Sequence, residues 1–204
     1  MACTTTSKGD VPTESFSKSP TAQSNSAPNT ENIFASTPVP SLEIQPRFGI
    51  DVGDTVPHFE FTLSDGSRQS TTQLASQGKP VFLYFFTTHW SVCRSELRSM
   101  KEIYPAFSEE INFYAIGQSQ FENLEKLEEY SRKEGYPWPV AEIDPKILKK
   151  LRVLQQSTKI GLDHQGVITY RAGYGDGDPK TWQQVFTDLA IGMGGWSLSG
   201  SSSN

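Results

Sequence analysis

One cysteine in the middle of the chain, Cys93, has neighbours that suit thiol chemistry. His89 and Trp90 come before it, and Arg94 and Glu96 come after it. Apolar residues then recur at helical spacing, so Cys93 lies near the beginning of a predicted helix. A cysteine with a histidine close by in the sequence is a candidate monothiol, which His89 could tune or serve as a proton carrier.

Each of these side chains also has a structural interpretation. Cysteine is common in buried cores, where its thiol is inert, and we favour this interpretation for Cys93. His89 is otherwise a polar residue at the surface end of a strand. Trp90 is either an exposed aromatic anchor for a partner or a side chain that folds inward and fills the site. Glu96 favours the helix dipole if it lies in the first helical turn.

The apolar pattern predicts the elements that position these residues. The continuous apolar run 80–86 is typical of a strand buried on both faces, and 111–116 predicts a second one. Residues 121–133 predict an amphipathic helix, and Asp-Pro pairs at 144–145 and 178–179 predict the first residues of two more. The predicted helices carry their apolar residues at Leu97, Met100, Ile103, Tyr104 and Phe107, at Leu124, Leu127 and Tyr130, and at Trp182, Val185, Phe186 and Leu189.

Turn signals complete the order of elements. Asp65-Gly66 joins two N-terminal strands, and the turn that ends at Gly166 joins two more. The order is hairpin, strand, helix, strand, helix, short strand, helix, hairpin, helix. Strands that alternate with helices indicate βαβ units around a mainly parallel core. We predict an α/β fold with a central mixed sheet, helices on both faces and an N-terminal β-hairpin.

Residues 53–190 resemble the TlpA-like thioredoxin family, within the redoxin and AhpC/TSA peroxiredoxin superfamily. The motifs that carry the resemblance are Gly53, Pro57, Phe59, Leu63 and Asp65-Gly66; Gly78-Lys79-Pro80-Val81; Cys93-Arg94-Ser95-Glu96-Leu97; Trp138-Pro139-Val140 with Asp144; and Leu162-Asp163 with Gly166. Their order and spacing imply a thioredoxin-like fold. The resemblance implies oxidoreductase or antioxidant ancestry and no cofactor.

The sequence departs from this family at two positions that matter for its chemistry. The family has Trp-Cys-x-x-Cys after the central strand, whereas Trp90 stands here in place of the first, attacking cysteine and Cys93 in place of the second. Ser157 stands in place of the family's cis-proline. A cis bond before Ser costs about 3 kcal/mol or more, so we expect a trans bond and a remodelled loop. These departures imply weak or absent dithiol exchange, with at most monothiol chemistry through Cys93.

Two other functions stay open. A peroxiredoxin-like thiol peroxidase would use Cys93. The Thr-x-x-Cys loop of that class brings Cys93 near the peroxidatic position only when it is shifted by one residue, and Trp90 then stands where Thr is needed. A non-catalytic envelope binding module would hold an envelope protein or an extended peptide in the former active-site groove, with Trp90 as anchor. His58 and His164, with Asp163, do not have the spacing of a metal site.

Composition divides the 204 residues into one domain and two tails. Residues 1–47 are mostly Ser, Thr, Pro, Asn and Gln, which predicts a disordered tether because so few apolar residues cannot offset chain entropy. Residues 48–191 form the predicted domain, and the Gly/Ser-rich residues 192–204 a flexible tail. The net charge of −5 argues against nucleic-acid binding, and no apolar stretch is long enough to span a bilayer.

Cys3 suggests a second role for a cysteine. Ala2-Cys3 followed by Thr and Ser resembles the acylation site of bacterial lipoproteins, with a small residue before the cysteine and a polar linker after it. Such an anchor would make the protein an extracytoplasmic lipoprotein, held at a membrane surface without spanning it. This hypothesis implies an apolar signal segment upstream of Met1. If the likeness is chance, we expect a soluble cytoplasmic protein.

Overall fold

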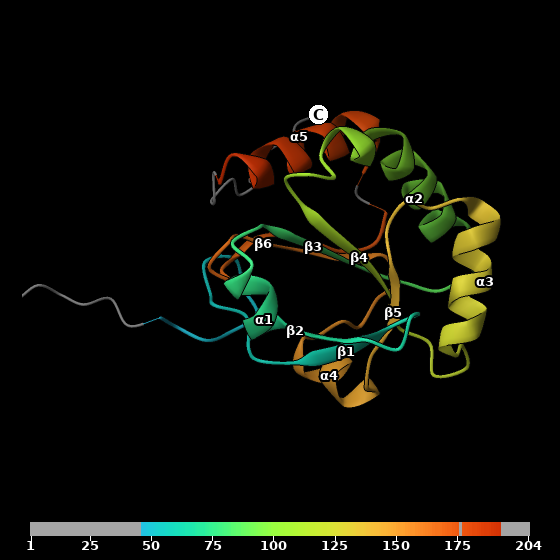
Figure 1. The fold of residues 1–204 in the computed structure, drawn as a ribbon, viewed down its shortest axis with the longest axis horizontal. Helices are drawn as coiled ribbons and strands as arrows, with labels where there is room; N and C mark the ends of the chain where they lie inside the picture. Colours follow the sequence, from blue (N-terminus) through green and yellow to red (C-terminus); the bar gives the residue numbers. More distant parts are fainter. Residues whose placement is uncertain (1–45, 176, 193–204) are drawn as a thin grey trace, which may run out of the picture. The chain divides into compact units, whose positions relative to one another are not determined.

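The apolar run that begins at Val81 forms the centre of a sheet. In the computed structural model, which describes residues 46–175 and 177–192, β3 (Val81–Phe86) has all of its residues buried. It pairs in parallel with β4 (Asn112–Gly117) and antiparallel with β6 (Thr158–Leu162). The sheet has seven strands in the order β2-β1-β5-β4-β3-β6-β7 (Figure 1). The four remaining strands are β1 (Glu60–Leu63), β2 (Arg68–Ser70), β5 (Val140–Glu142) and β7 (Ile168–Ala172).

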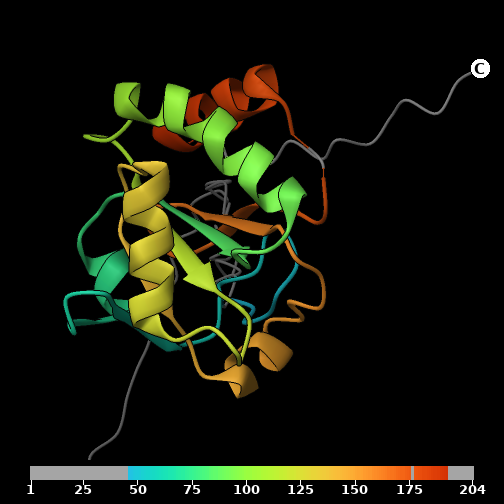
Figure 2. The same cartoon turned by 90° about the vertical axis from the view of Figure 1, so that its right-hand side faces the viewer.

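Helices cover both faces of this sheet. α2 (Ser91–Ile103) and α5 (Pro179–Ala190) lie on one face, and α3 (Leu124–Glu134) packs beside α2 (Figures 1 and 2). The short helices α1 (Thr71–Ser76) and α4 (Pro145–Lys150) lie on the other face. A 3₁₀ turn over Tyr104–Ala106 follows α2.

The alternation of side chains along β3 creates two hydrophobic cores. Phe82, Tyr84 and Phe86 pack with residues of α2, α3 and α5. Leu83 and Phe85 belong to the second core, which also contains residues of α1 and α4. Because a strand points successive side chains to opposite faces, a fully apolar strand needs such a core on each side. Cys93 belongs to the first core, as does Tyr84.

The structure confirms most of the predicted elements. The mixed sheet, the helices on both faces and the N-terminal hairpin are present, and Asp65 accepts a 2.8 Å hydrogen bond from Ser67 N in the predicted turn. Asp144 and Asp178 cap α4 and α5 as expected. The sequence did not predict α1. The helix expected from residue 121 begins at Leu124, because the side chain of Asn123 caps it.

Other sequence predictions concern residues at the chain ends. The predicted tether 1–47 and tail 192–204 lie outside the described residues except for positions 46, 47 and 192. Cys3 also lies outside them. Among residues 46–175 and 177–192, no helix has both the length and the apolar character needed to cross a membrane.

Candidate functional site

Trp90 lies at the N-terminal end of α2, next to the end of β3. It is the N-cap residue of the helix, with extended backbone, and its side chain makes no capping hydrogen bond. Arg94 N donates to the Trp90 carbonyl at 3.2 Å, which is the first hydrogen bond of the helix. The Trp90 side chain is 45% exposed. Of the two interpretations of Trp90, the structure therefore supports the exposed one.

Cys93 lies one helical turn further along and is fully buried. Burial raises the pKa of its thiol, because the apolar surroundings disfavour the thiolate. Polar interactions with the Thr87 backbone and the Tyr84 hydroxyl lower the pKa of the thiol, but burial outweighs them. A thiol in this state is a weak nucleophile at neutral pH.

A buried polar cluster of Tyr84, Glu96, Ser157 and Lys159 lies behind Cys93. Glu96 is at its centre: Lys159 Nζ is 2.8 Å from Glu96 Oε1, and the Tyr84 hydroxyl donates to Glu96 Oε2 at 2.7 Å. Ser157 Oγ donates to the same Oε2 and lies 2.8 Å from the Tyr84 hydroxyl. Lys159 is fully buried and also donates to the Gly173 carbonyl at 2.7 Å. The cluster thus matches a buried cation to a buried carboxylate.

The cluster corrects one sequence interpretation and extends another. Glu96 is the sixth residue of α2, beyond the first turn, so it does not act on the helix N-terminus; it is the partner of Lys159. Tyr84 was expected to be an apolar core residue, but its hydroxyl serves the cluster. Burial and the nearby Glu96 raise the pKa of Tyr84 far above its usual range, so it stays a donor.

Ser157 holds its position through an unusual backbone conformation. Its φ is 66°, in the left-handed region, and its N–H donates to the Phe85 carbonyl at 2.9 Å. Proline fixes φ near −65° and has no N–H, so it does not fit this conformation. The loop before β6 is therefore shaped for a residue with a backbone donor and a short polar side chain.

A second polar group lies at the surface beside Trp90. The side chain of Glu122 is fully buried. Its carboxylate oxygen Oε1 accepts hydrogen bonds from Thr88 N at 2.9 Å and from Thr88 Oγ1. His89 Nδ1 lies 2.9 Å from the same oxygen. The side chain of His89 is 57% exposed, so the buried carboxylate orients an imidazole that faces solvent. His89 does not belong to the buried polar cluster around Glu96.

Two adjoining cavities open next to this group. One has a volume of about 360 Å³ and is lined by Thr87, His89, Trp90 and Phe121, among others. The other, of about 280 Å³, is lined in part by Glu122. Both share the loop residues 118–120 and Pro145. We call the two together the oxygen-lined cavity, for the side-chain oxygens described below.

Arg94 is the remaining candidate residue, and its side chain contacts α3. Its Nε is 3.4 Å from the Tyr130 hydroxyl and 3.8 Å from Glu134 Oε1. Within the described residues, no group of three or more His, Cys, Asp or Glu side chains is placed to hold a metal ion.

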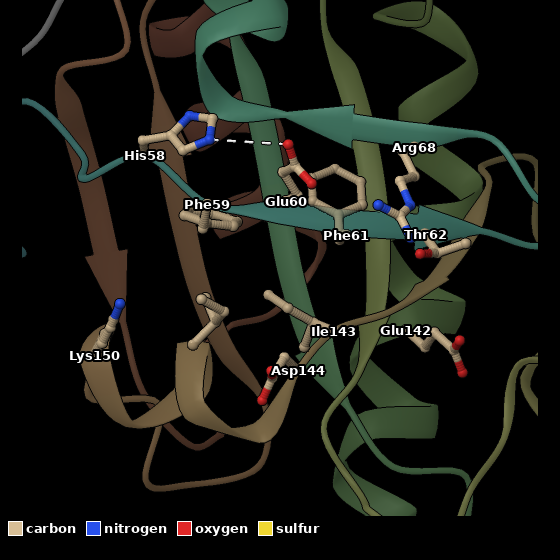
Figure 3. A pocket seen from close by; sticks show the side chains of 11 residues that line it. His58, Phe59, Glu60, Phe61, Thr62, Arg68, Glu142, Ile143, Asp144 and Lys150 are labelled. Atoms are coloured by element: carbon tan, nitrogen blue, oxygen red, sulfur yellow. Dashed lines mark ion pairs between the residues drawn. The ribbon is translucent and has the colours of Figure 1, made fainter.

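Another cavity, of about 640 Å³, lies between β1 and the β5–α4 connection (Figure 3). Its lining carries charges of both signs, including Arg68, Lys150, Glu142 and a 4.0 Å contact between His58 and Glu60. These charges do not converge on one kind of ligand, and none of the residues singled out for thiol chemistry lines the cavity.

Sequence reasoning did not find three of the site residues: Tyr84, Glu122 and Lys159. A signal for Lys159 was present, because a lysine in the middle of an apolar strand must find a partner. Tyr84 and Lys159 are register partners across β3 and β6, which a single sequence does not reveal. Glu122 falls within the predicted helix 121–133, but the helix begins after it, at Leu124.

A model of the AhpC/TSA family matches residues 52–171. The solution structure of a candidate protein disulfide isomerase from Bacteroides thetaiotaomicron superimposes with a TM-score of 0.60 and 25% identity, covering 70% of this chain and 91% of that one. The thioredoxin domain of a thiol-disulfide oxidoreductase from Bacteroides vulgatus gives 0.58 and 18%, covering 69% and 99%. A thioredoxin-family thiol:disulfide interchange protein from Chlorobium tepidum gives 0.57 and 20%, covering 72% and 97%.

These similarities confirm the predicted thioredoxin-like fold. A search of curated protein sequences finds no match to the chain.

Proposed function

The chain belongs to the AhpC/TSA family, and on that premise we propose that it is a member without dithiol exchange, whose site binds a polypeptide instead of reacting with it. The observation that carries the proposal is the exposure of two side chains at the start of α2, Trp90 and Cys93. An indole, 45% exposed, occupies the helix end, whereas the nearby thiol is fully buried.

The environment of Cys93 supports the loss of redox chemistry. Attack on a disulfide needs a thiolate that can reach its target. Burial both raises the pKa of the Cys93 thiol and blocks access to it. The same two properties disfavour a peroxiredoxin-like thiol peroxidase, which needs a low thiol pKa. Ser157 supports the proposal too, since its φ of 66° shapes a loop that proline could not adopt.

The surface around Trp90 supports the binding role. Trp90 and Phe121, which is 80% exposed, both line the 360 Å³ cavity. Exposed aromatic residues beside a cavity are typical of binding hot spots. In the resembling family this face receives extended polypeptide substrates, and we propose that it receives a polypeptide here as well.

Insulin reduction in the presence of dithiothreitol tests the redox part. We expect wild type and Cys93→Ser to give the same rate as buffer alone. The matched gain-of-thiol variant is Trp90→Cys, which places two cysteines three residues apart at the helix end and should exceed both. Turnover by the wild type that disappears in Cys93→Ser would overturn the proposal.

Binding of a reduced, carboxymethylated protein tests the second part, because its blocked thiols allow only non-covalent association. We expect Trp90→Ala to weaken this binding at least about tenfold, as loss of a hot-spot aromatic does. Phe48→Ala is the control, since Phe48 is also an exposed aromatic (69%) but does not line the cavity. Equal affinity of wild type and Trp90→Ala would contradict the binding role.

We also propose an extracytoplasmic location through acylation of Cys3. The support is the sequence around Cys3, which resembles a lipoprotein acylation site. Metabolic labelling with a radioactive fatty acid tests this proposal in cells that express the gene with its natural upstream region. Label should enter the wild type and not Cys3→Ser; an unlabelled wild type would contradict it.

A further inference from the structure

Three side-chain oxygens around the oxygen-lined cavity have no hydrogen-bond partner. They are Thr87 Oγ1, Gln118 Oε1 and Glu122 Oε2, each fully shielded from solvent. Thr87 lines one part of the cavity, Glu122 lines the other, and Gln118 lines both. Buried polar atoms in folded proteins are normally paired, so three unpaired oxygens around adjoining parts of one cavity favour a donor from outside the chain.

Glu122 is the strongest of the three observations. Its side chain is fully buried, and Oε1 is held by Thr88 and His89. Its second oxygen, Oε2, is left without a donor. A buried carboxylate oxygen without a partner is costly, and a charged donor is the partner that compensates best.

The rest of the lining fits a flat cation. No lysine or arginine lines either part of the cavity. The exposed rings of Trp90 and Phe121 lie at its rim. Aromatic faces attract cations, and a guanidinium stacks on them better than an ammonium does. Its five N–H groups in a planar fork can serve several separate oxygens, whereas lysine presents one compact charge.

We propose that the oxygen-lined cavity binds the guanidinium group of an arginine in the partner polypeptide. This inference rests on the proposed function, because the cavity lies beside Trp90, the proposed anchor. The two parts of the cavity, of about 360 and 280 Å³, are each at the small end for ligand sites, which suits one long side chain better than a cofactor. The net charge of −5 also favours a basic partner.

We assign the arginine to another chain. Residues 1–45 and 193–204 contain no arginine, and no arginine of the described residues lines the cavity. Arg94 and Arg98 are paired with Glu134, and Arg47 with Asp54. A second copy of this chain is the other source, and the experiment below separates it from a different partner.

The test uses the full chain and the peptide acetyl-Ala-Ala-Ser-Arg-Ser-Ala-Ala-amide, followed through the NMR signal of the Trp90 indole N–H. The matched peptide carries citrulline, which has the shape of arginine without its charge. We expect the arginine peptide to bind at least about tenfold more tightly, because charged hydrogen bonds are roughly twice as strong as neutral ones. The affinity of the matched lysine peptide should lie between those of the arginine and citrulline peptides. Added salt should reduce the preference for arginine over citrulline.

Variants of the cavity identify the group responsible. Glu122→Gln keeps an acceptor for Thr88 but removes the charge, and it should abolish the preference for arginine over citrulline. Glu125→Gln, an exposed acid on the first turn of α3, is the control and should keep it. If Glu122→Gln does not fold, Gln118→Met removes another of the three oxygens at similar size and should lower the preference measurably.

Three results would overturn the inference. Equal binding of the arginine and citrulline peptides is one, and an unchanged preference in Glu122→Gln is the second. The third is a wild-type dimer, seen in sedimentation velocity, that Glu122→Gln dissociates, because a second copy would then be the occupant. If the carboxymethylated protein still binds through Trp90 in these cases, the proposed function stands without the arginine site. If Trp90→Ala leaves that binding unchanged, the proposed function fails whatever the peptides show.

Discussion

The buried polar cluster includes Glu96 of α2, and the oxygen-lined cavity is lined by Trp90 at the N-terminal end of that helix. The two differ in how their polar atoms are hydrogen-bonded. In the cluster, Lys159 neutralises Glu96, and two hydroxyl groups complete the set. In the cavity, a fully buried carboxylate has only one of its oxygens paired. Both contain a buried glutamate, but only the glutamate of the cavity, Glu122, has a carboxylate oxygen without a hydrogen-bond partner among the described residues.

This difference separates residues that hold the fold from residues that are available to a ligand. Glu96 matches a motif position of the resembling family, yet all its described partners belong to the protein itself. Glu122 matches no motif that we recognised, yet it is among the residues that line a cavity, and its Oε2 has no hydrogen-bond partner among the described residues. Motif position alone would therefore place the ligand-binding site at the cluster, whereas the unpaired oxygen of Glu122 favours the cavity.

The largest effect that we expect comes from breaking the cluster. Lys159→Met leaves the Glu96 carboxylate buried without its cation, which costs about 3–5 kcal/mol of unfolding free energy. Urea unfolding of wild type and variant measures this loss. The double variant Lys159→Met/Glu96→Gln removes both charges and should recover at least half of it. If the free energy of unfolding of Lys159→Met lies within about 1 kcal/mol of the wild-type value, the ion pair does not stabilise the fold as we propose.

Removing the carboxylate at the cavity should cost less. Glu122→Ala leaves the buried Thr88 N–H without its acceptor, so we expect a loss of about 1–3 kcal/mol. Glu125→Ala should change stability by less than about 0.5 kcal/mol, because Glu125 is exposed. Equal effects of the two substitutions would mean that the bonds to Thr88 contribute nothing measurable.

The Cys93 thiol makes the free energy of unfolding depend on pH. Its pKa is raised in the folded state above the usual value of about 8.5, so folding favours the neutral thiol. The stabilisation this gives is fully present below about pH 8.5 and is lost as pH rises through that value toward the folded pKa. Wild type should therefore lose stability relative to Cys93→Ala between about pH 8.5 and 10, by at most about 1.4 kcal/mol per pH unit. Urea melts in reducing buffer check this, and a difference that is constant with pH would contradict it.

The smallest effect concerns Trp90. Because its indole is 45% exposed and makes no capping hydrogen bond, Trp90→Ala should change the free energy of unfolding by less than about 0.5 kcal/mol. The same variant should lose polypeptide binding, which sharpens the contrast between stability and function. A large loss of stability would instead make Trp90 a packing residue.

The sequence predicted the fold better than the site, for a physical reason. The apolar run of β3 and the Asp caps of α4 and α5 are local signals, and they were sufficient for the order of elements. The buried polar cluster depends on the register of β3 and β6, which places Tyr84 beside Lys159 and was not visible in the sequence. Glu122 was missed because its burial depends on contacts with Thr88, far away in the sequence.

The most direct test of the central claim is the rate at which iodoacetamide alkylates Cys93 in the folded protein at pH 7.5, measured in a Cys3→Ser background and compared with the rate in 8 M urea. We predict that the folded rate is lower by at least about 100-fold, because a fully buried thiol reacts only when the structure opens. A folded rate equal to or above the rate in urea would show an accessible, activated thiol and would contradict the account.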